Sequence, residues 1–112
     1  MQASAVPGRS GPSDVLRDDA VVQALADTFR LLGDPTRVRI VDALAGGQRC
    51  VHEISERIGL SESAVSHQLR LMRSMRIVRG RREGRCVYYT LDDQHVLDLF
   101  QQGLRHVIEE RA

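Results

Sequence analysis

The first third of the chain carries apolar residues at helical spacing. They recur every three to four residues between about Asp14 and Leu32, which predicts one amphipathic helix that ends at Gly33. Residues 1–13 are small, polar and rich in proline, glycine and serine, so we expect a disordered N-terminal tail there. The apolar stripe of the helix consists of Val22, Leu25, Phe29 and Leu32.

A second helix is predicted directly after the first. Asp34 is a typical N-cap, and Pro35 suits the first helical position because its missing N–H would have no partner there. Gly46 and Gly47 end the helical pattern. We expect its buried side to consist of Val38, Ile40, Val41 and Leu44.

Two further helices are predicted at about residues 51–58 and 62–75. Only three residues separate them: Gly59 stops the first, and Ser61 caps the second. Two helices joined by so short a turn are typical of a helix-turn-helix.

The C-terminal third alternates between strand and helix patterns. Residues 77–82 and 85–91 predict two strands around a turn at Glu83–Gly84. A last helix is expected from Gln94 to Glu110, with Asp92 as its N-cap. The expected fold is mainly α with a small β-hairpin: a dimeric winged helix-turn-helix domain over residues 14–112, with dimerisation helices at both ends.

The helix at 62–75 has two contrasting faces. Val65, Leu69 and Met72 fall within about 60° of one another and should pack inward. The opposite face is polar, and the only carboxylate of the helix, Glu62, lies at its margin. A merely solvated face would more often mix Glu with Arg, so we favour contact with the DNA major groove. The DNA-contacting candidates are Ser63, Ser66, His67 and Arg70, with Gln68 at the boundary; Ser74 shares this face.

Positive charge is concentrated in the middle of the chain. The net charge is only +1, but residues 36–90 hold 11 arginines and five acids, whereas residues 1–35 and 91–112 are both net acidic. The hairpin guanidiniums repel one another unless an anion is near, and double-stranded DNA would supply phosphates. A random asymmetry of charge in a neutral domain is the alternative. The hairpin candidates for DNA contact are Arg79, Arg81, Arg82 and Arg85.

The last helix carries four residues of metal-binding type: Asp93, His95, His106 and Glu109. His106 returns to within about 20° of His95 but lies roughly 16 Å further along the axis. A zinc ion reaches ligands only about 2 Å away, so one helix cannot bring both histidines to one metal. An antiparallel second copy can, because Asp93 and His95 of one chain then meet His106 and Glu109 of the other. Ordinary surface residues on a wet helix face are the alternative.

The chemistry of these four ligands favours zinc. Two imidazoles and two carboxylates close a tetrahedron and leave no open position, which suits sensing and not catalysis. Cobalt fits the same geometry. No third ligand lies on the same chain beside His106 and Glu109, and no nucleophile or pocket motif is evident, so we expect no enzyme activity and no small-molecule substrate.

Composition restricts the location of the protein. The chain has no long apolar run and no signal-peptide core, so we expect no membrane span. Two cysteines in a chain without a disulfide framework are typical of the reducing cytoplasm.

Four stretches of the chain together resemble the ArsR/SmtB family of metal-sensing winged-helix repressors, and most closely its zinc-sensing branch. The resemblance implies a homodimer that binds operator DNA without metal and releases it when metal binds. It also implies that His106 acts allosterically, by donating a hydrogen bond to the backbone carbonyl near Arg76 at the end of the recognition helix. The matching stretches are residues 32–40, 61–73 and 84–89, and the set Asp93, His95, His106 and Glu109.

The chain departs from this family at one place. Some relatives carry a thiolate-rich second site where this chain has Cys50, Val51 and His52, and His52 stands where a cysteine is often found. Residues 1–13 hold no cysteine or histidine to complete a site. A second metal site at Cys50 and His52 therefore stays an alternative, as does a regulator that senses thiol oxidation through Cys50 or Cys86.

Overall fold

The computed structural model describes residues 15–111, and the chain divides into two compact units between Gly33 and Asp34. In the first unit, helix α2 (Asp19–Leu32) begins after Asp18, whose carboxylate accepts a hydrogen bond from the backbone N of Ala20 at 2.9 Å. The expected start of this helix at about residue 14 was therefore too early, because the Asp18 cap interrupts the helical path. The predicted tail at 1–13 lies outside the described residues.

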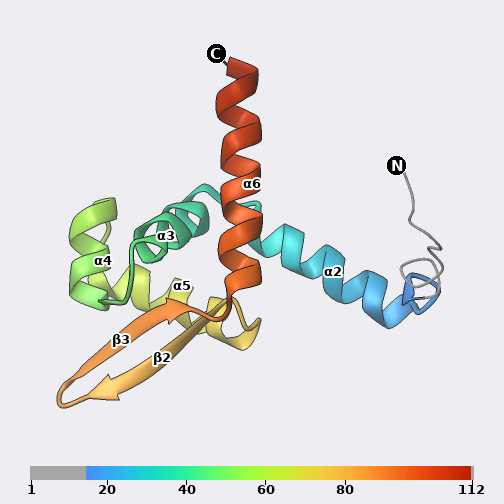
Figure 1. Ribbon diagram of the computed structural model, residues 1–112. Coiled ribbons are helices and arrows are strands. Elements are labelled where there is room, and N and C mark those ends of the chain that lie inside the picture. The colour runs from blue at the N-terminus through green and yellow to red at the C-terminus, as the bar shows by residue number, and fades with distance from the viewer. Residues whose placement is uncertain (1–14, 112) are drawn as a thin grey trace. The chain divides into compact units, whose positions relative to one another are not determined.

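The second unit contains the remaining elements (Figure 1). They are α3 (Pro35–Ala45), β1 (Arg49–Cys50), α4 (Val51–Ile58), α5 (Glu62–Ser74), β2 (Val78–Glu83), β3 (Cys86–Leu91) and α6 (Gln94–Arg111).

The sheet has three antiparallel strands in the order β1-β3-β2. Strands β2 and β3 form the predicted hairpin, and their closing pair is Glu83 with Cys86, so the turn is Gly84–Arg85, one residue later than expected. Strand β1 was not predicted. It has only two residues, which pair with Tyr88 and Tyr89, and a segment that short shows no periodicity in the sequence.

The core of this unit lies where α3, α4, α5 and β2 meet. Val38 is an exception to the predicted pattern, because it is 41% exposed while Ala43 is buried. At 100° per residue, Val38 faces away from the direction that Ile40, Ala43 and Leu44 share. The fully buried side chains are Ile40, Val41, Ile54, Val65, Leu69, Met72 and Val78.

Helix boundaries follow local capping. Gly59 ends α4 in a left-handed conformation with φ 74°, and the Ser61 hydroxyl accepts from the backbone N of Ala64 at 3.1 Å to begin α5. Helix α6 begins at Gln94, as expected, but its cap differs from the prediction: Asp93 Oδ1 accepts from Val96 N at 3.2 Å, whereas the N–H of Asp92 donates to the carbonyl of Ile77. Asp93, and not Asp92, is the cap.

None of the described helices combines the length and the apolarity that crossing a membrane requires.

Candidate nucleic-acid interface and metal centre

The buried side of α5 determines which side chains it presents. Val65, Leu69 and Met72 have no exposed surface, as the sequence pattern predicted. Their burial turns the opposite face outward, where short polar side chains and one guanidinium gather, with Glu62 at the margin of this face. On this face Ser63, His67, Arg70 and Ser74 are exposed, and Ser66 is half-buried. Such donors and acceptors match the edges of base pairs and the phosphates beside them.

Gln68 has a partner inside the protein. Its side-chain oxygen accepts a hydrogen bond from Arg37 Nε of α3 at 2.9 Å, in a partly buried position. This contact joins α3 to α5 across 31 residues of sequence. Gln68 therefore positions the recognition helix, and its oxygen is already engaged.

The first turn of α5 contains a contact that sequence reasoning missed. His52 Nδ1 on α4 lies 2.9 Å from the carboxylate oxygen Oε2 of Glu62. This hydrogen bond to Glu62, reinforced by the charge of Glu56, raises the pKa of His52 above its ordinary value. The two residues are ten apart on different helices, so only their polar types hinted at the pair.

The last turn of α5 ends in a strained residue. Arg76 has φ 60°, in the left-handed region that β-carbon-bearing residues rarely adopt. The N–H of Arg76 donates to the carbonyl of Arg73, and that of Ile77 to the carbonyl of Met72. These two bonds form a Schellman motif, whose left-handed position is usually glycine. The strain lies at the residue that the family resemblance links to allostery.

The four wing arginines are exposed but differ in their partners. Arg81 donates to Glu83 at 2.6 Å and to Gln48 at 3.0 Å, and Arg79 donates to Thr90 at 3.3 Å. Within residues 15–111, no hydrogen bond or ion pair holds Arg82 or Arg85. The charges best placed to meet an external anion are therefore those of Arg82 and Arg85.

The tip and stem of the wing depend on glycine. Gly84 has φ 65° at the first central position of the turn, which a side chain would strain. A β-carbon at Gly80 would lie 3.0 Å from the Tyr89 ring and 3.1 Å from Val87. Tyr89 thus packs over the backbone of β2 and stiffens the wing.

The four metal-type residues lie at two separate places along α6. At its start, Asp93 Oδ1 and His95 Nδ1 are 3.6 Å apart, and the His95 side chain is 93% exposed. His106 and Glu109 are also exposed, about three turns further along the helix axis. Because α6 is continuous from Gln94 to Arg111, the two pairs are separated by roughly 16 Å. Within the described residues no three potential ligands of one chain come together around a metal.

Asp93 combines two tasks. The N–H of Val96 holds the pKa of its carboxyl below the usual range, and His95 acts in the same direction. Because Oδ1 accepts the capping bond, Asp93 is anionic at neutral pH and its position is fixed at the helix start. A preset anionic oxygen beside an exposed imidazole suits a divalent cation.

Cys50 and His52 do not face one partner. The backbone N of Cys50 donates to Glu53 at 2.9 Å, while His52 contacts Glu62. Cys50 is half-buried on β1 opposite Tyr88, and Cys86 is exposed two residues before Tyr88 on β3. The two thiols thus share one face of the sheet on diagonal positions.

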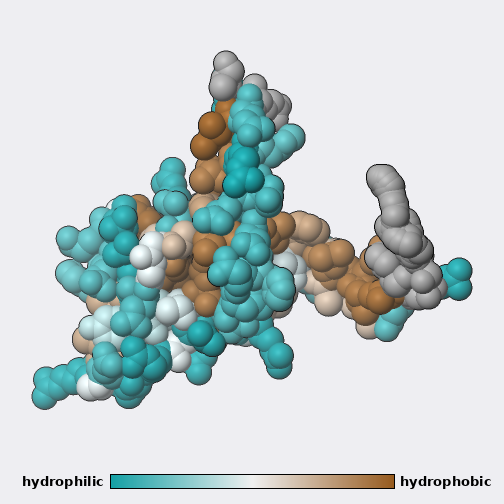
Figure 2. Space-filling view, in the orientation of Figure 1, coloured by the Kyte–Doolittle hydropathy of each residue, from teal (hydrophilic) through white to brown (hydrophobic). Residues whose placement is uncertain are grey.

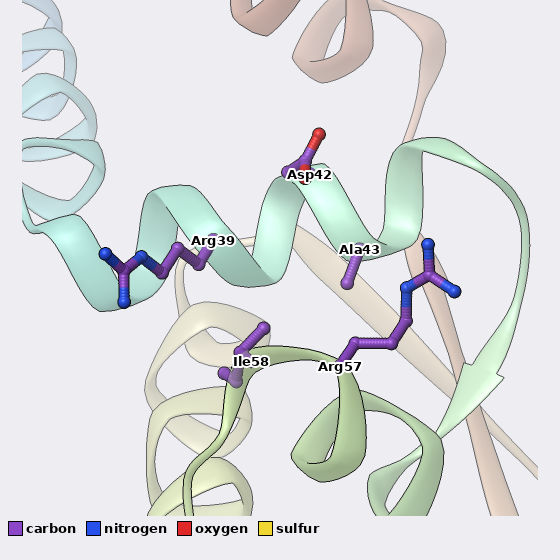
Figure 3. A pocket seen from close by; sticks show the side chains of 5 residues that line it. All are labelled: Arg39, Asp42, Ala43, Arg57 and Ile58. Atoms are coloured by element: carbon purple, nitrogen blue, oxygen red, sulfur yellow. The ribbon is translucent and has the colours of Figure 1, made fainter.

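A groove of about 350 Å³ lies between α3 and α4 (Figure 3). Its walls include Arg39 and Arg57, but their guanidiniums point to opposite ends of the groove. The arginines therefore do not converge on one anion.

The sequence is similar to known regulators along most of its length. Residues 34–79 match the family model of the bacterial regulatory proteins of the arsR family. The chain is 47% identical over 87 residues to a transcriptional repressor SmtB homolog of Synechocystis, covering 78% of this chain and 66% of that one. It is 41% identical over 101 residues to the HTH-type transcriptional regulator NmtR of Mycobacterium tuberculosis, covering 90% and 83%.

Solved structures agree with the sequence comparison. The homodimeric winged helix-turn-helix DNA-binding domain Mb0332 of Mycobacterium bovis matches with a TM-score of 0.76 at 30% identity, covering 85% of this chain and 87% of that one. The antimony-specific transcriptional repressor AntR matches with a TM-score of 0.79 at 29% identity, covering 96% and 98%. The recognition face, the wing and these similarities agree, and the chain belongs to the arsR family of bacterial regulatory proteins.

Proposed function

We propose that this chain is a homodimeric transcriptional repressor that binds operator DNA without metal and releases it when zinc, or a similar divalent metal, binds between the subunits. Each site takes Asp93 and His95 from one chain and His106 and Glu109 from the other. The observation that carries the proposal is the roughly 16 Å between these two exposed pairs on one continuous helix. Only a second chain brings them to one ion.

The apolar surface of α6 supports a second copy as the partner. Figure 2 shows hydrophobic residues along one side of this helix and hydrophilic residues along the other. On α2, Val22, Leu25 and Phe29 are also exposed. Such faces usually become buried in an interface, and the similar Mb0332 domain is homodimeric. The large exposed apolar residues of α6 are Leu99, Leu104, Val107 and Ile108.

The donor set selects the class of metal. Imidazole nitrogens and carboxylate oxygens in a closed tetrahedron suit zinc, and cobalt fits equally. The similar repressor AntR is antimony-specific, so family membership alone does not choose the ion. The proposal of zinc therefore rests on the ligand types of Asp93, His95, His106 and Glu109, and not on family membership.

The route from metal to DNA runs through the dimer shape. Zinc fixes the angle between the two α6 helices, and that angle determines the distance between the two recognition helices. Metal therefore needs only to favour a shape that misfits the operator, with a coupling of about 1–3 kcal/mol. We expect His106 to donate its second ring N–H to the carbonyl near Arg76, as the family resemblance implies. The strained Arg76 backbone, with φ 60°, is the place where such a bond would act on α5.

The test replaces His106 by glutamine and measures operator affinity with and without saturating zinc. We expect unchanged affinity without metal and loss of zinc-dependent release, because the carboxamide binds zinc weakly and does not reproduce the imidazole bridge. Gln102→Asn, one turn earlier on the same exposed side, is a matched control. If zinc still releases DNA from His106→Gln as from the unmodified chain, this site is not the switch.

A redox-sensing regulator is a second candidate, favoured by the shared sheet face of Cys50 and Cys86. Oxidation of these thiols would act on the wing near its tip, since Cys86 forms the closing pair of the turn with Glu83. Release of operator DNA by peroxide but not by zinc, abolished in Cys86→Ser, would establish this candidate instead.

A further inference from the structure

The first turn of α5 holds a carboxylate in a place where DNA-binding surfaces normally exclude one. Glu62 is the only acidic residue of α5, and its side chain is 59% exposed. In a helix-turn-helix, the N-terminal residues of the recognition helix contact base edges. A carboxylate there is repelled by phosphates unless it accepts hydrogen bonds from a base.

His52 orients this carboxylate. The N–H at Nδ1 donates to Oε2 of Glu62 at 2.9 Å, and this bond crosses from the first turn of α4 to the first turn of α5. Among residues 15–111, no second group hydrogen-bonds to Glu62, so Oε1 retains its acceptor capacity. The Ser61 cap on the preceding residue holds the backbone of the same turn. Oε2 is thus anchored and Oε1 keeps its acceptor capacity, on a residue that lies one helical turn before Ser66.

We propose that Glu62 is a specificity-determining residue, which accepts a hydrogen bond from the N4 amino group of a cytosine in the major groove, and that His52 positions it. This inference rests on the proposed binding of operator DNA through α5. Cytosine is the base whose major-groove edge offers an amino donor without a neighbouring acceptor, so it is the base that a carboxylate reads. One C·G pair in each half-site is then chosen by this residue.

The competing explanation is helix stability. A negative charge in the first turn interacts favourably with the helix dipole, whatever DNA is bound. On that explanation, Glu62→Gln lowers thermal stability a little and changes affinity for all DNA sequences by one common factor. The two explanations differ in base preference and not in overall affinity.

The experiment selects double-stranded DNA from a randomised library with the full chain, and then measures affinity for each single base-pair change in the selected half-site. The unmodified chain should prefer cytosine at one position by roughly ten- to a hundred-fold. In Glu62→Gln the preference for cytosine at that position should fall to about two-fold, or be replaced by a preference for adenine, whose edge a carboxamide recognises. The base preferences at the other positions should not change. His52→Ala should reduce the same preference, at the same position, by a smaller factor.

Glu56→Gln is the matched control. Glu56 lies on α4 near His52 and loses the same charge, but it makes no hydrogen bond to that ring. We expect it to raise affinity for all sequences alike and to leave every base preference unchanged. If Glu62→Gln behaves like Glu56→Gln, the inference is wrong although operator binding stands. If the unmodified chain selects no sequence at all, the proposed function fails together with it.

Discussion

The helix-turn-helix with its sheet and the terminal helix α6 differ in how far a single chain completes them. Between α4 and β2 the core side chains Ile54, Leu69 and Val78 are buried, and Leu60 and Leu71 are each 38% exposed. On α6, by contrast, Leu104 and Ile108 are 44% and 57% exposed. The part that we propose to read DNA has its core within one chain, whereas the helix that we propose to sense metal keeps an apolar face that one chain does not cover. On the proposed function, regulation acts where one chain leaves its apolar surface uncovered, so that assembly at α6 does not disturb the core beneath α5.

The largest expected effect is on the free energy of unfolding, which should respond differently to a Leu→Ala change in each of the two regions. Leu69→Ala empties a fully buried position and should lower the free energy of unfolding by about 2–5 kcal/mol. Leu104→Ala removes the same atoms from an exposed position, so it should leave the unfolding of the isolated chain nearly unchanged and weaken dimerisation instead. Urea unfolding at low concentration and sedimentation across concentrations measure the two quantities. Equal losses of chain stability in both variants would remove the contrast between the regions.

Mixing two inactive variants tests whether each metal site is shared between chains. Asp93→Ala/His95→Ala and His106→Ala/Glu109→Ala each destroy both sites of their own homodimer. A mixed dimer has one site with all four ligands, since intact pairs from the two chains meet there. We expect tight zinc binding only after mixing, at about one ion per mixed dimer, by competition with a chelator. Tight binding by either variant alone would contradict an intersubunit site.

The wing arginines should separate according to their partners. Arg85→Ala and Arg82→Ala should weaken binding to all DNA sequences and flatten the slope of log affinity against log salt by about one unit per lost phosphate contact. Arg81→Ala should change that slope less, because Arg81 is held by Glu83 and Gln48. Fluorescence anisotropy over a salt series provides the slopes. An unchanged slope in all three variants would place the wing outside the interface.

Replacing the strained residue Arg76 at the end of α5 should change the free energy of unfolding by a smaller amount, and should raise it. Arg76→Gly relieves a positive φ and should stabilise the fold by about 1 kcal/mol, although glycine also adds unfolded-state entropy. Thermal unfolding measures the gain. Arg73→Gly, in the preceding helical turn, is the control and should destabilise. A loss of stability in Arg76→Gly would show that the arginine side chain outweighs the strain.

The smallest expected effect is the titration of His52. Its pKa is raised above 6.5, mainly by Glu62, so the attraction between the two side chains is fully present below that pH. It is lost as the pH rises through the raised pKa. An NMR titration of the ring should show this shift, and Glu62→Gln should return the value toward the ordinary one. A His52 pKa that does not respond to this change would mean that the pair does not form in solution.

Sequence reasoning predicted the helices closely where capping signals were strong, as at Ser61 and Gly59. It misplaced the start of α2 and the cap of α6, because more than one carboxylate near each helix start could act as the cap. It also predicted that Val38 is buried, because the apolar pattern of α3 is broader than the face that packs in the core. It missed β1, since two residues form a strand only when β3 offers an edge. The four ligand positions on α6 were predicted from spacing, and their role stays a prediction.

The order of helices and hairpin, the inward face of α5 and the distance between the two ligand pairs on α6 follow from the sequence alone. Periodicity, caps and the rise of a helix are local properties, and local properties can be read along a chain. Only the tertiary structure decided that Arg37 engages Gln68, that Glu83 and Gln48 hold Arg81, and that His52 meets Glu62. These contacts join residues whose proximity depends on how helices and strands pack, and packing is set by the whole core and not by any one segment.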